Sequence, residues 1–179
     1  APAFAKEAPT VAIGRPVASL RESSGLVLGK VGAAEHAFVA DEDDEAIVEV
    51  DPATNAVVAT TKLGARPRDL LLLADGRLAA TLPDANAVVV LAREETGSLR
   101  EVARAKTVAE PIALALDPKD VMLYVSTGAS HSLVGLDAKG LEEKRRVSLG
   151  REPRAVLVSS DGARVFVTHA VEDYVSVVG

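Results

Sequence analysis

Short runs of alternating apolar and polar residues fill most of the chain, a pattern typical of half-buried β-strands. Four of these runs align with one another: "EAIVEVD" (Glu45–Asp51), "NAVVVLA" (Asn86–Ala92), "HSLVGLD" (His131–Asp137) and "DYVSVVG" (Asp173–Gly179). They begin at residues 45, 86, 131 and 173, so successive runs are 41, 45 and 42 residues apart. A period of this length indicates a modular fold built from similar units.

Each unit contains further strand-like runs at matching positions. One set lies just upstream: "AFVAD" (Ala37–Asp41), "LAATL" (Leu78–Leu82), "LYVST" (Leu123–Thr127) and "VFVTH" (Val165–His169). Before these, three units have a Pro-marked entry, an apolar strand and an Asp-containing turn: "RPRDLLLLADG" (Arg66–Gly76), "EPIALALDPKD" (Glu110–Asp120) and "EPRAVLVSSDG" (Glu152–Gly162). Three units end in a fourth run: "AVVATTKLG" (Ala56–Gly64), "SLREVARAKTV" (Ser98–Val108) and "LEEKRRVSLG" (Leu141–Gly150). Each unit therefore reads as a four-stranded antiparallel meander.

A single sheet of this kind cannot bury both of its faces, whereas sheets stacked radially can, so the repeat predicts an all-β fold of the β-propeller type. We expect an N-terminal segment, 1–24, followed by about four blades at 25–64, 65–108, 109–150 and 151–179. The first unit, "GLVLGKVGAAEHA", lacks the Pro and the Asp-Gly, and the fourth unit ends after its third strand.

The strand motifs resemble the YVTN-type β-propeller repeat, most closely in "YVST", "FVTH" and "EDYVSVV". The resemblance covers about residues 25–179 and implies a ring that usually has seven blades. Some bacterial proteins with such blades are fused to, or act beside, dihaem c-type cytochrome peroxidase-like domains. The resemblance thus implies a cytochrome domain as one kind of partner.

Three architectures are compatible with this strand count. Residues 10–20 have strand character without a partner in their own unit, and a strand there would complete the fourth blade of a closed four-bladed ring. The chain would otherwise be part of a larger ring, whose remainder lies elsewhere, or would pair with a second copy into an eight-bladed ring.

Composition narrows the functional classes. Hydrophobic residues make up 48% of the chain and aromatic residues 3%, so the core is expected to consist of aliphatic side chains. A net charge of −6 argues against nucleic acid as a partner, and no apolar run is long enough for membrane insertion. The chain has no Cys, which excludes disulfides, thiolate metal sites and covalent haem attachment within it. Its opening, "APAFAKEAPT", is typical either of a mature end after signal-peptide cleavage or of a sequence trimmed at its start. The first interpretation predicts a periplasmic or extracellular location.

Several charged residues are expected on one face of the propeller. In a meander, the loop that enters the innermost strand and the loop between the second and third strands project from the same side, near the central channel. The arginines that fall there are Arg66, Arg68, Arg151 and Arg154. Converging guanidinium groups would bind a carboxylate or phosphate. The alternative is that each arginine pairs with a neighbouring acid, such as Asp69 or Glu152.

The same face is expected to hold the weak candidates for a metal. His131 and His169 would lie in different loops, as ligands or proton carriers, or as caps for loop backbone groups. The acidic loop "DEDDE" includes Asp41, Asp43 and Asp44, which would suit calcium but lack the Gly and the ligand alternation of an EF-hand. A solvated acidic loop is the simpler interpretation, and we predict no cofactor within the chain.

No nucleophile elbow, phosphate-binding Gly loop or zinc-ligand spacing occurs in the sequence. We therefore predict an exported, non-catalytic propeller that binds a ligand, another protein domain or the rest of its ring. The alternative is a propeller enzyme of the lactonase or quinoprotein type, with a metal or cofactor over the channel.

Overall fold

The computed structural model describes residues 25–107 and 109–179, and these residues form an all-β fold with one short 3-10 turn. The fold class predicted from the repeat is therefore confirmed. The ring-closing strand predicted at residues 10–20 lies outside the described residues. No helix in the described ranges is long and apolar enough to cross a membrane.

The strands are arranged as four antiparallel sheets, which we call blades. The first blade contains β1 (Leu26–Val31), β2 (Ala34–Asp41), β3 (Ala46–Asp51) and β4 (Ala56–Lys62). The second contains β5 (Leu70–Leu72), β6 (Leu78–Leu82), β7 (Ala87–Arg93) and β8 (Leu99–Lys106), with the 3-10 turn η1 (Pro83–Ala85) between β6 and β7. The third contains β9 (Pro111–Leu116), β10 (Met122–Thr127), β11 (Ser132–Asp137) and β12 (Glu143–Ser148). The fourth contains β13 (Pro153–Val158), β14 (Val165–His169) and β15 (Val175–Val178).

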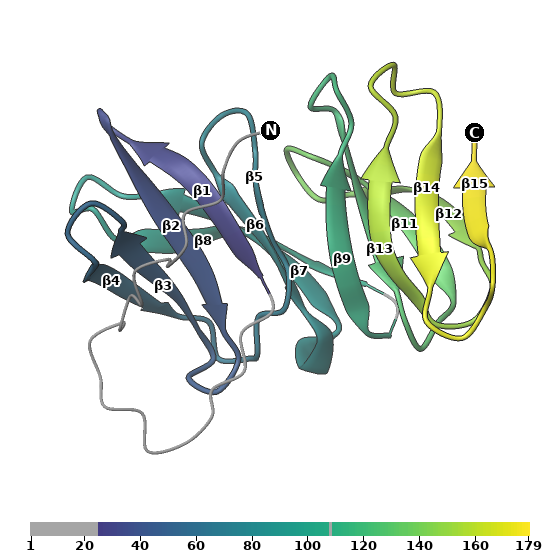
Figure 1. The fold of residues 1–179 in the computed structure, drawn as a ribbon, viewed down its shortest axis with the longest axis horizontal. Coiled ribbons are helices and arrows are strands. Elements are labelled where there is room, and N and C mark those ends of the chain that lie inside the picture. The colour runs from purple at the N-terminus through teal and green to yellow at the C-terminus, as the bar shows by residue number, and fades with distance from the viewer. Residues whose placement is uncertain (1–24, 108) are drawn as a thin grey trace, which may run out of the picture.

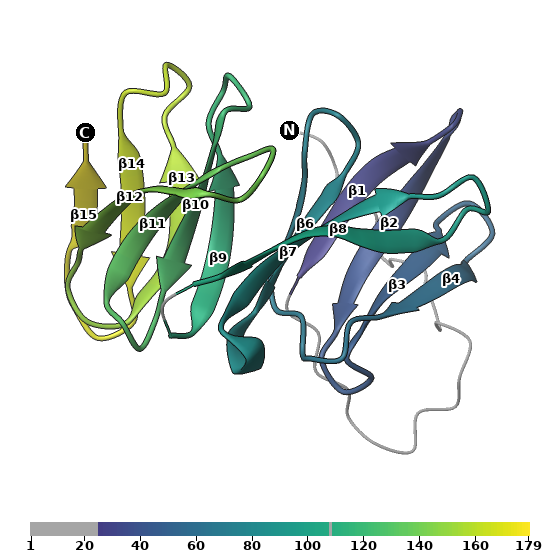
Figure 2. The same cartoon turned by 180° about the vertical axis from the view of Figure 1, so that it is seen from behind.

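Each blade is a meander whose strands pair in chain order, and the first strand of each blade contacts the first strand of the next. The blades follow one another in an open arc, with the first blade and the fourth at opposite ends in both views (Figures 1 and 2). A closed four-bladed ring would bring those two blades together. The described residues instead have the arrangement expected for part of a larger ring.

Aliphatic side chains fill the space between successive blades. Phe38 and Ile47 of the first blade pack in one buried cluster with Leu78 and Val89 of the second. A second cluster joins the second and third blades, and a third, centred on Leu133, joins the third and fourth. Because both faces of an interior blade are covered, its central strands are apolar at nearly every position, as in β7.

Hydroxyl groups link the innermost strands across two of these interfaces. Thr81 Oγ1 accepts a hydrogen bond from Asp69 N (2.9 Å) and donates one to Ile112 O in the next blade (3.2 Å). Ser126 Oγ, at the equivalent position of the third blade, accepts from Ala113 N (3.2 Å) and donates to Arg154 O (2.5 Å). We call these two side chains the bridging hydroxyls. Ala40 holds the position in the first blade and has no hydroxyl.

The loops alternate between two ends of the blades. The entry face carries the loops before β5, β9 and β13 and the loops between the second and third strands of each blade. The turn face carries the remaining turns. Three entry-face loops place a residue at the same left-handed backbone position just before the third strand: Glu45 (φ 51°), Asn86 (φ 50°) and His131 (φ 49°). Asn tolerates this conformation best, so the other two side chains are held there by the loop.

Candidate functional site

The entry-face arginines form separate ion pairs rather than one cluster. Arg154 Nη2 lies 2.8 Å from Glu152 Oε2, Arg151 Nε lies 3.4 Å from Glu172 Oε1, and Arg66 Nε lies 3.7 Å from Asp84 Oδ2. The side chains of Arg66 and Arg151 are 60% and 70% exposed, respectively. These three arginines therefore pair with neighbouring acids, which is one of the two arrangements considered from the sequence. Glu152, the partner of Arg154, is one of the acids named there.

Arg68 lies next to the half-buried carboxyl group of Asp69 at the start of the second blade. Burial raises the pKa of Asp69, and its hydrogen bonds to Leu114 N and Leu70 N, together with the charge of Arg68, oppose that rise. Asp69 Oδ2 accepts from Leu114 N at 2.8 Å and Oδ1 from Leu70 N at 3.0 Å. Because Leu114 belongs to β9, this carboxyl group ties the second blade to the third.

The two histidines brace loops. His131 Nδ1 accepts a hydrogen bond from Glu152 N (3.3 Å), just as Asn86 Oδ1 in the preceding blade accepts one from Glu110 N (2.9 Å). His169 Nδ1 lies 2.9 Å from Arg151 O, and since a carbonyl oxygen only accepts, Nδ1 is the donor. In the neutral ring, Nε2 then accepts from Ser176 Oγ at 2.9 Å. The capping role considered from the sequence is thus the one that these contacts support.

The acidic loop is braced in the same way. Asp41 Oδ1 accepts from Asp44 N at 3.0 Å, and Lys62 Nζ donates to Asp44 O at 2.6 Å. Nothing in the described ranges brings three His, Asp or Glu side chains together in a way that would hold a metal ion. A calcium ion bound through Asp41, Asp43 and Asp44 is the less favoured alternative from the sequence, and the solvated acidic loop stays the prediction.

A buried polar group that the sequence analysis missed lies between the first and second blades, toward the turn face. Glu49 in β3 is only 1% exposed. Its Oε1 lies 2.5 Å from His36 Nδ1 and 2.8 Å from Arg93 Nη2. The Arg93 contact is an ion pair without the alignment of a hydrogen bond, and Glu49 Oε2 has no hydrogen-bond partner in the part of the chain described. These three residues line a cavity of about 450 Å³.

The contact between Glu49 and Arg93 could not be predicted from the sequence because the two residues are far apart along the chain. Glu49 and Arg93 are 44 residues apart and in different blades, and neither belongs to a motif associated with a function. One signal was present: Glu49 occupies a position where the second and fourth blades have Val90 and Val177. A carboxylate at a repeat position that is otherwise apolar is a reason to search for its partners.

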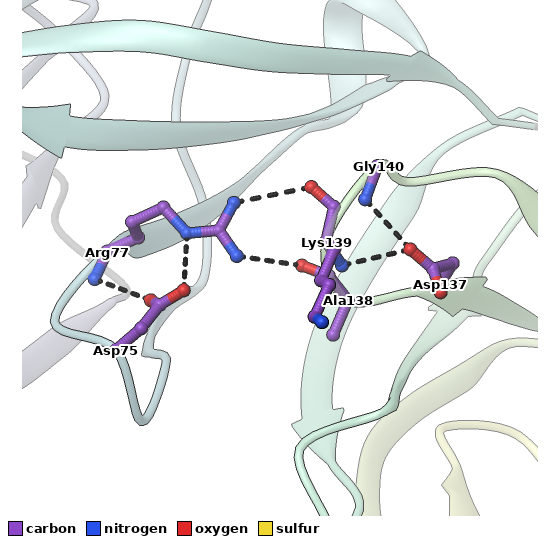
Figure 3. A network of polar contacts seen from close by, with 6 residues as sticks. All are labelled: Asp75, Arg77, Asp137, Ala138, Lys139 and Gly140. Carbon is purple, nitrogen blue, oxygen red and sulfur yellow. Dashed lines mark hydrogen bonds and ion pairs between the residues drawn. The ribbon is translucent and has the colours of Figure 1, made fainter.

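A second polar link joins the second and third blades on the turn face (Figure 3). The Arg77 guanidinium group donates to Lys139 O and Ala138 O, both at 3.3 Å, and its Nε to Asp75 Oδ2 at 2.7 Å. The receiving turn is held by Asp137 Oδ1, which accepts from Gly140 N (2.9 Å) and Lys139 N (3.1 Å). The hydrogen bond from Gly140 N has the largest effect on the carboxyl group of Asp137, and together with the one from Lys139 N it holds the pKa of Asp137 below its ordinary value.

The fold and these contacts define a β-propeller protein, and comparisons with known proteins agree at that level. No protein-family model matches the sequence, and no curated protein is significantly similar to it. Among solved structures, the periplasmic gluconolactonase PpgL of Pseudomonas aeruginosa is 24% identical (TM-score 0.75), with 88% of this chain and 49% of that chain covered. Hydrazine synthase of Kuenenia stuttgartiensis is 19% identical (TM-score 0.74), with 92% and 47% covered.

The Swd1 β-propeller domain of Myceliophteria thermophila is 11% identical (TM-score 0.72), with 88% of this chain and 53% of that chain covered. At such identities the likeness concerns the fold alone. The chain spans about half the length of each of these three structures.

Proposed function

We propose that this chain is a non-catalytic binding module of an exported propeller, and that its entry face receives a ligand or another protein domain. The observation that supports this most directly is the arrangement of Arg66 and Arg151, whose guanidinium groups are exposed. The Arg151 loop is braced by His169 Nδ1, which donates to Arg151 O, and the Arg66 loop by Arg68 N, which donates to Thr81 O. Charged groups on rigid loops bind without a large loss of conformational entropy, which suits a recognition surface.

The kind of partner follows from the chemistry of that surface and from the sequence resemblance. Exposed guanidinium groups favour a partner that presents carboxylate groups. A c-type cytochrome domain is the partner class suggested by the YVTN-type motifs, and it would contact this propeller in the periplasm. The propeller would hold the partner domain in position and orientation, and the partner domain would carry the haem.

The proposal is tested by capturing binding partners from a periplasmic extract with three immobilised proteins. Wild type and the turn-face variant Arg100→Glu, whose side chain is 65% exposed, should retain the same haem-containing protein, seen as a Soret absorbance. The entry-face variant Arg66→Glu/Arg151→Glu should lose it. Equal retention by all three proteins, or retention by none, would contradict an entry-face binding role.

A lactonase-type enzyme is the alternative, and it calls for a separate measurement. Hydrolysis of D-glucono-1,5-lactone, followed by acid release with and without added calcium, should match the uncatalysed rate. Catalysis that disappears in Asp43→Ala or His169→Ala would replace the binding proposal with an enzymatic one.

A further inference from the structure

The cavity beside Glu49, which we call the Glu49 cavity, lies between the first and second blades and has a volume of about 450 Å³. Its walls come from the strands of the first blade, from β7 and from the turn that follows β7. Both blades have four strands in the described structure, so these walls are formed between two neighbouring blades and not at an outer face of the arc. Small-molecule sites typically have volumes of about 300–1,000 Å³.

Glu49 supplies a buried acceptor in the wall of this cavity. Its side chain is 2% exposed, and its Oε1 contacts His36 Nδ1 and Arg93 Nη2. Its Oε2 is buried and has no hydrogen-bond partner among the residues that the structure describes. Buried polar atoms nearly always have a partner, because an unsatisfied charged acceptor is costly. Folding has already removed bulk water from this oxygen atom, so a ligand that donates to it loses little on binding.

Arg93 supplies a donor beside that acceptor. Its Nη1 donates to Gly97 O, and its Cζ lies 5.9 Å from the centre of the Phe38 ring, so the guanidinium group is held from two sides. Its Nη2 lies 2.8 Å from Glu49 Oε1 but makes no hydrogen bond within the described part of the chain. The Arg93 side chain is 28% exposed, so a ligand that enters the cavity meets the guanidinium group before it meets the carboxylate.

The charges in the wall favour a neutral ligand that both donates and accepts hydrogen bonds. An anionic ligand would be attracted by Arg93 but repelled by Glu49, and a cationic ligand would be attracted by Glu49 but repelled by Arg93. A hydroxyl group donates and accepts, so neighbouring hydroxyl groups of one ligand match Oε2 and Nη2 together. The other polar side chains of the wall are themselves hydroxyls: Thr60, Thr61, Thr96 and Ser98.

We propose that the Glu49 cavity binds a neutral sugar or sugar alcohol. One ligand hydroxyl group donates to Glu49 Oε2 and another accepts from Arg93 Nη2. His36 Nδ1 donates to Glu49 Oε1 and fixes the carboxylate, and Val31 and Val58 offer apolar surface to the C–H groups of the ligand. The cavity lies toward the turn face, so this site goes beyond the proposed entry-face function and does not rest on it.

Isothermal titration calorimetry with matched probes tests the proposal. The neutral probes are D-glucose, D-galactose and D-mannitol, and the charged probes are D-gluconate and D-glucosamine, which are similar in size and also carry several hydroxyl groups. At least one neutral probe should bind wild type with a Kd of about 1 mM or below, and both charged probes should bind at least about tenfold more weakly than that probe. Failure of all three neutral probes to bind, or a charged probe that binds as tightly as the best neutral one, would overturn the proposal.

Two variants test whether binding takes place in this cavity. Ser98→Trp introduces a large side chain at an exposed position of the wall, so it should fold and weaken binding of the neutral probe by at least about tenfold. His36→Met/Glu49→Val/Arg93→Ala removes the polar groups and should abolish binding, with folding checked by circular dichroism.

Ala163→Trp is the matched control, because it adds the same side chain at an exposed turn position of the fourth blade, outside the cavity. It should bind the neutral probe as wild type does. Undiminished binding by Ser98→Trp or by the folded triple variant would overturn the assignment of the site. Partner capture through the entry face should be unchanged in Ser98→Trp, so either proposal can fail independently of the other.

Discussion

At the scale of single residues, Glu49 is a buried carboxyl group whose stability depends on its two neighbours. A carboxylate buried between blades costs several kcal/mol unless cations and hydrogen bonds compensate it, and here His36 and Arg93 both contact one of its oxygen atoms. The same residues join β2, β3 and the end of β7. The group therefore supplies, at the first interface, a polar link in place of the bridging hydroxyl that Ala40 lacks.

Replacing Glu49 by Gln should lower the free energy of unfolding by about 2–4 kcal/mol, because Arg93 loses its counter-charge and a neutral amide is a weaker hydrogen-bond acceptor for His36 than a buried carboxylate. The triple variant His36→Met/Glu49→Val/Arg93→Ala copies residues from equivalent positions of other blades. It should recover to within about 1 kcal/mol of wild type, since replacing a buried ion group by packed apolar side chains is often neutral. Urea unfolding measures both, and a triple variant less stable than the single one would contradict this account.

Asp69 should make stability depend on pH in the direction opposite to that of most carboxyl groups. Its pKa is raised by burial above the ordinary 3.8. The folded state therefore binds its proton more tightly, and stability falls as pH rises from below 3.8 through the raised pKa. Asn at this position does not ionise but has one acceptor oxygen fewer. Asp69→Asn should thus be less stable than wild type at pH 3, by a margin that shrinks by pH 7. A margin independent of pH would contradict this.

At the scale of the strand, the bridging hydroxyls allow a matched comparison within one chain. Thr81→Val leaves Asp69 N and Ile112 O without a partner in a fully buried site, and should lower the free energy of unfolding by about 1–3 kcal/mol. Thr168→Val is the same change at the equivalent exposed position and should lower the free energy of unfolding by less than about 0.5 kcal/mol. Equal losses would show that the hydroxyl acts within its own blade.

Strands were the part of this molecule most open to prediction, for a physical reason. A strand such as β14 shows its period of two locally, and its recurrence every forty residues or so identifies the blade. Which partners a side chain meets depends on the neighbouring blade. The loop-bracing contacts of His131 with Glu152 N and the ion pair of Arg66 with Asp84 needed the three-dimensional arrangement. So did the Glu49 group, because its members are far apart in the chain.

At the scale of the whole molecule, the bridging hydroxyls give the arc a polarity. Each one accepts a hydrogen bond from a backbone N–H group of its own blade and donates one to a carbonyl oxygen of the following blade, never of the preceding one. Successive blades are therefore joined like monomers in a polar filament, with a donor end and an acceptor end. A ring assembled from separate pieces of this kind can close in one rotational sense only, and a piece inserted the wrong way round would set two donor ends against each other.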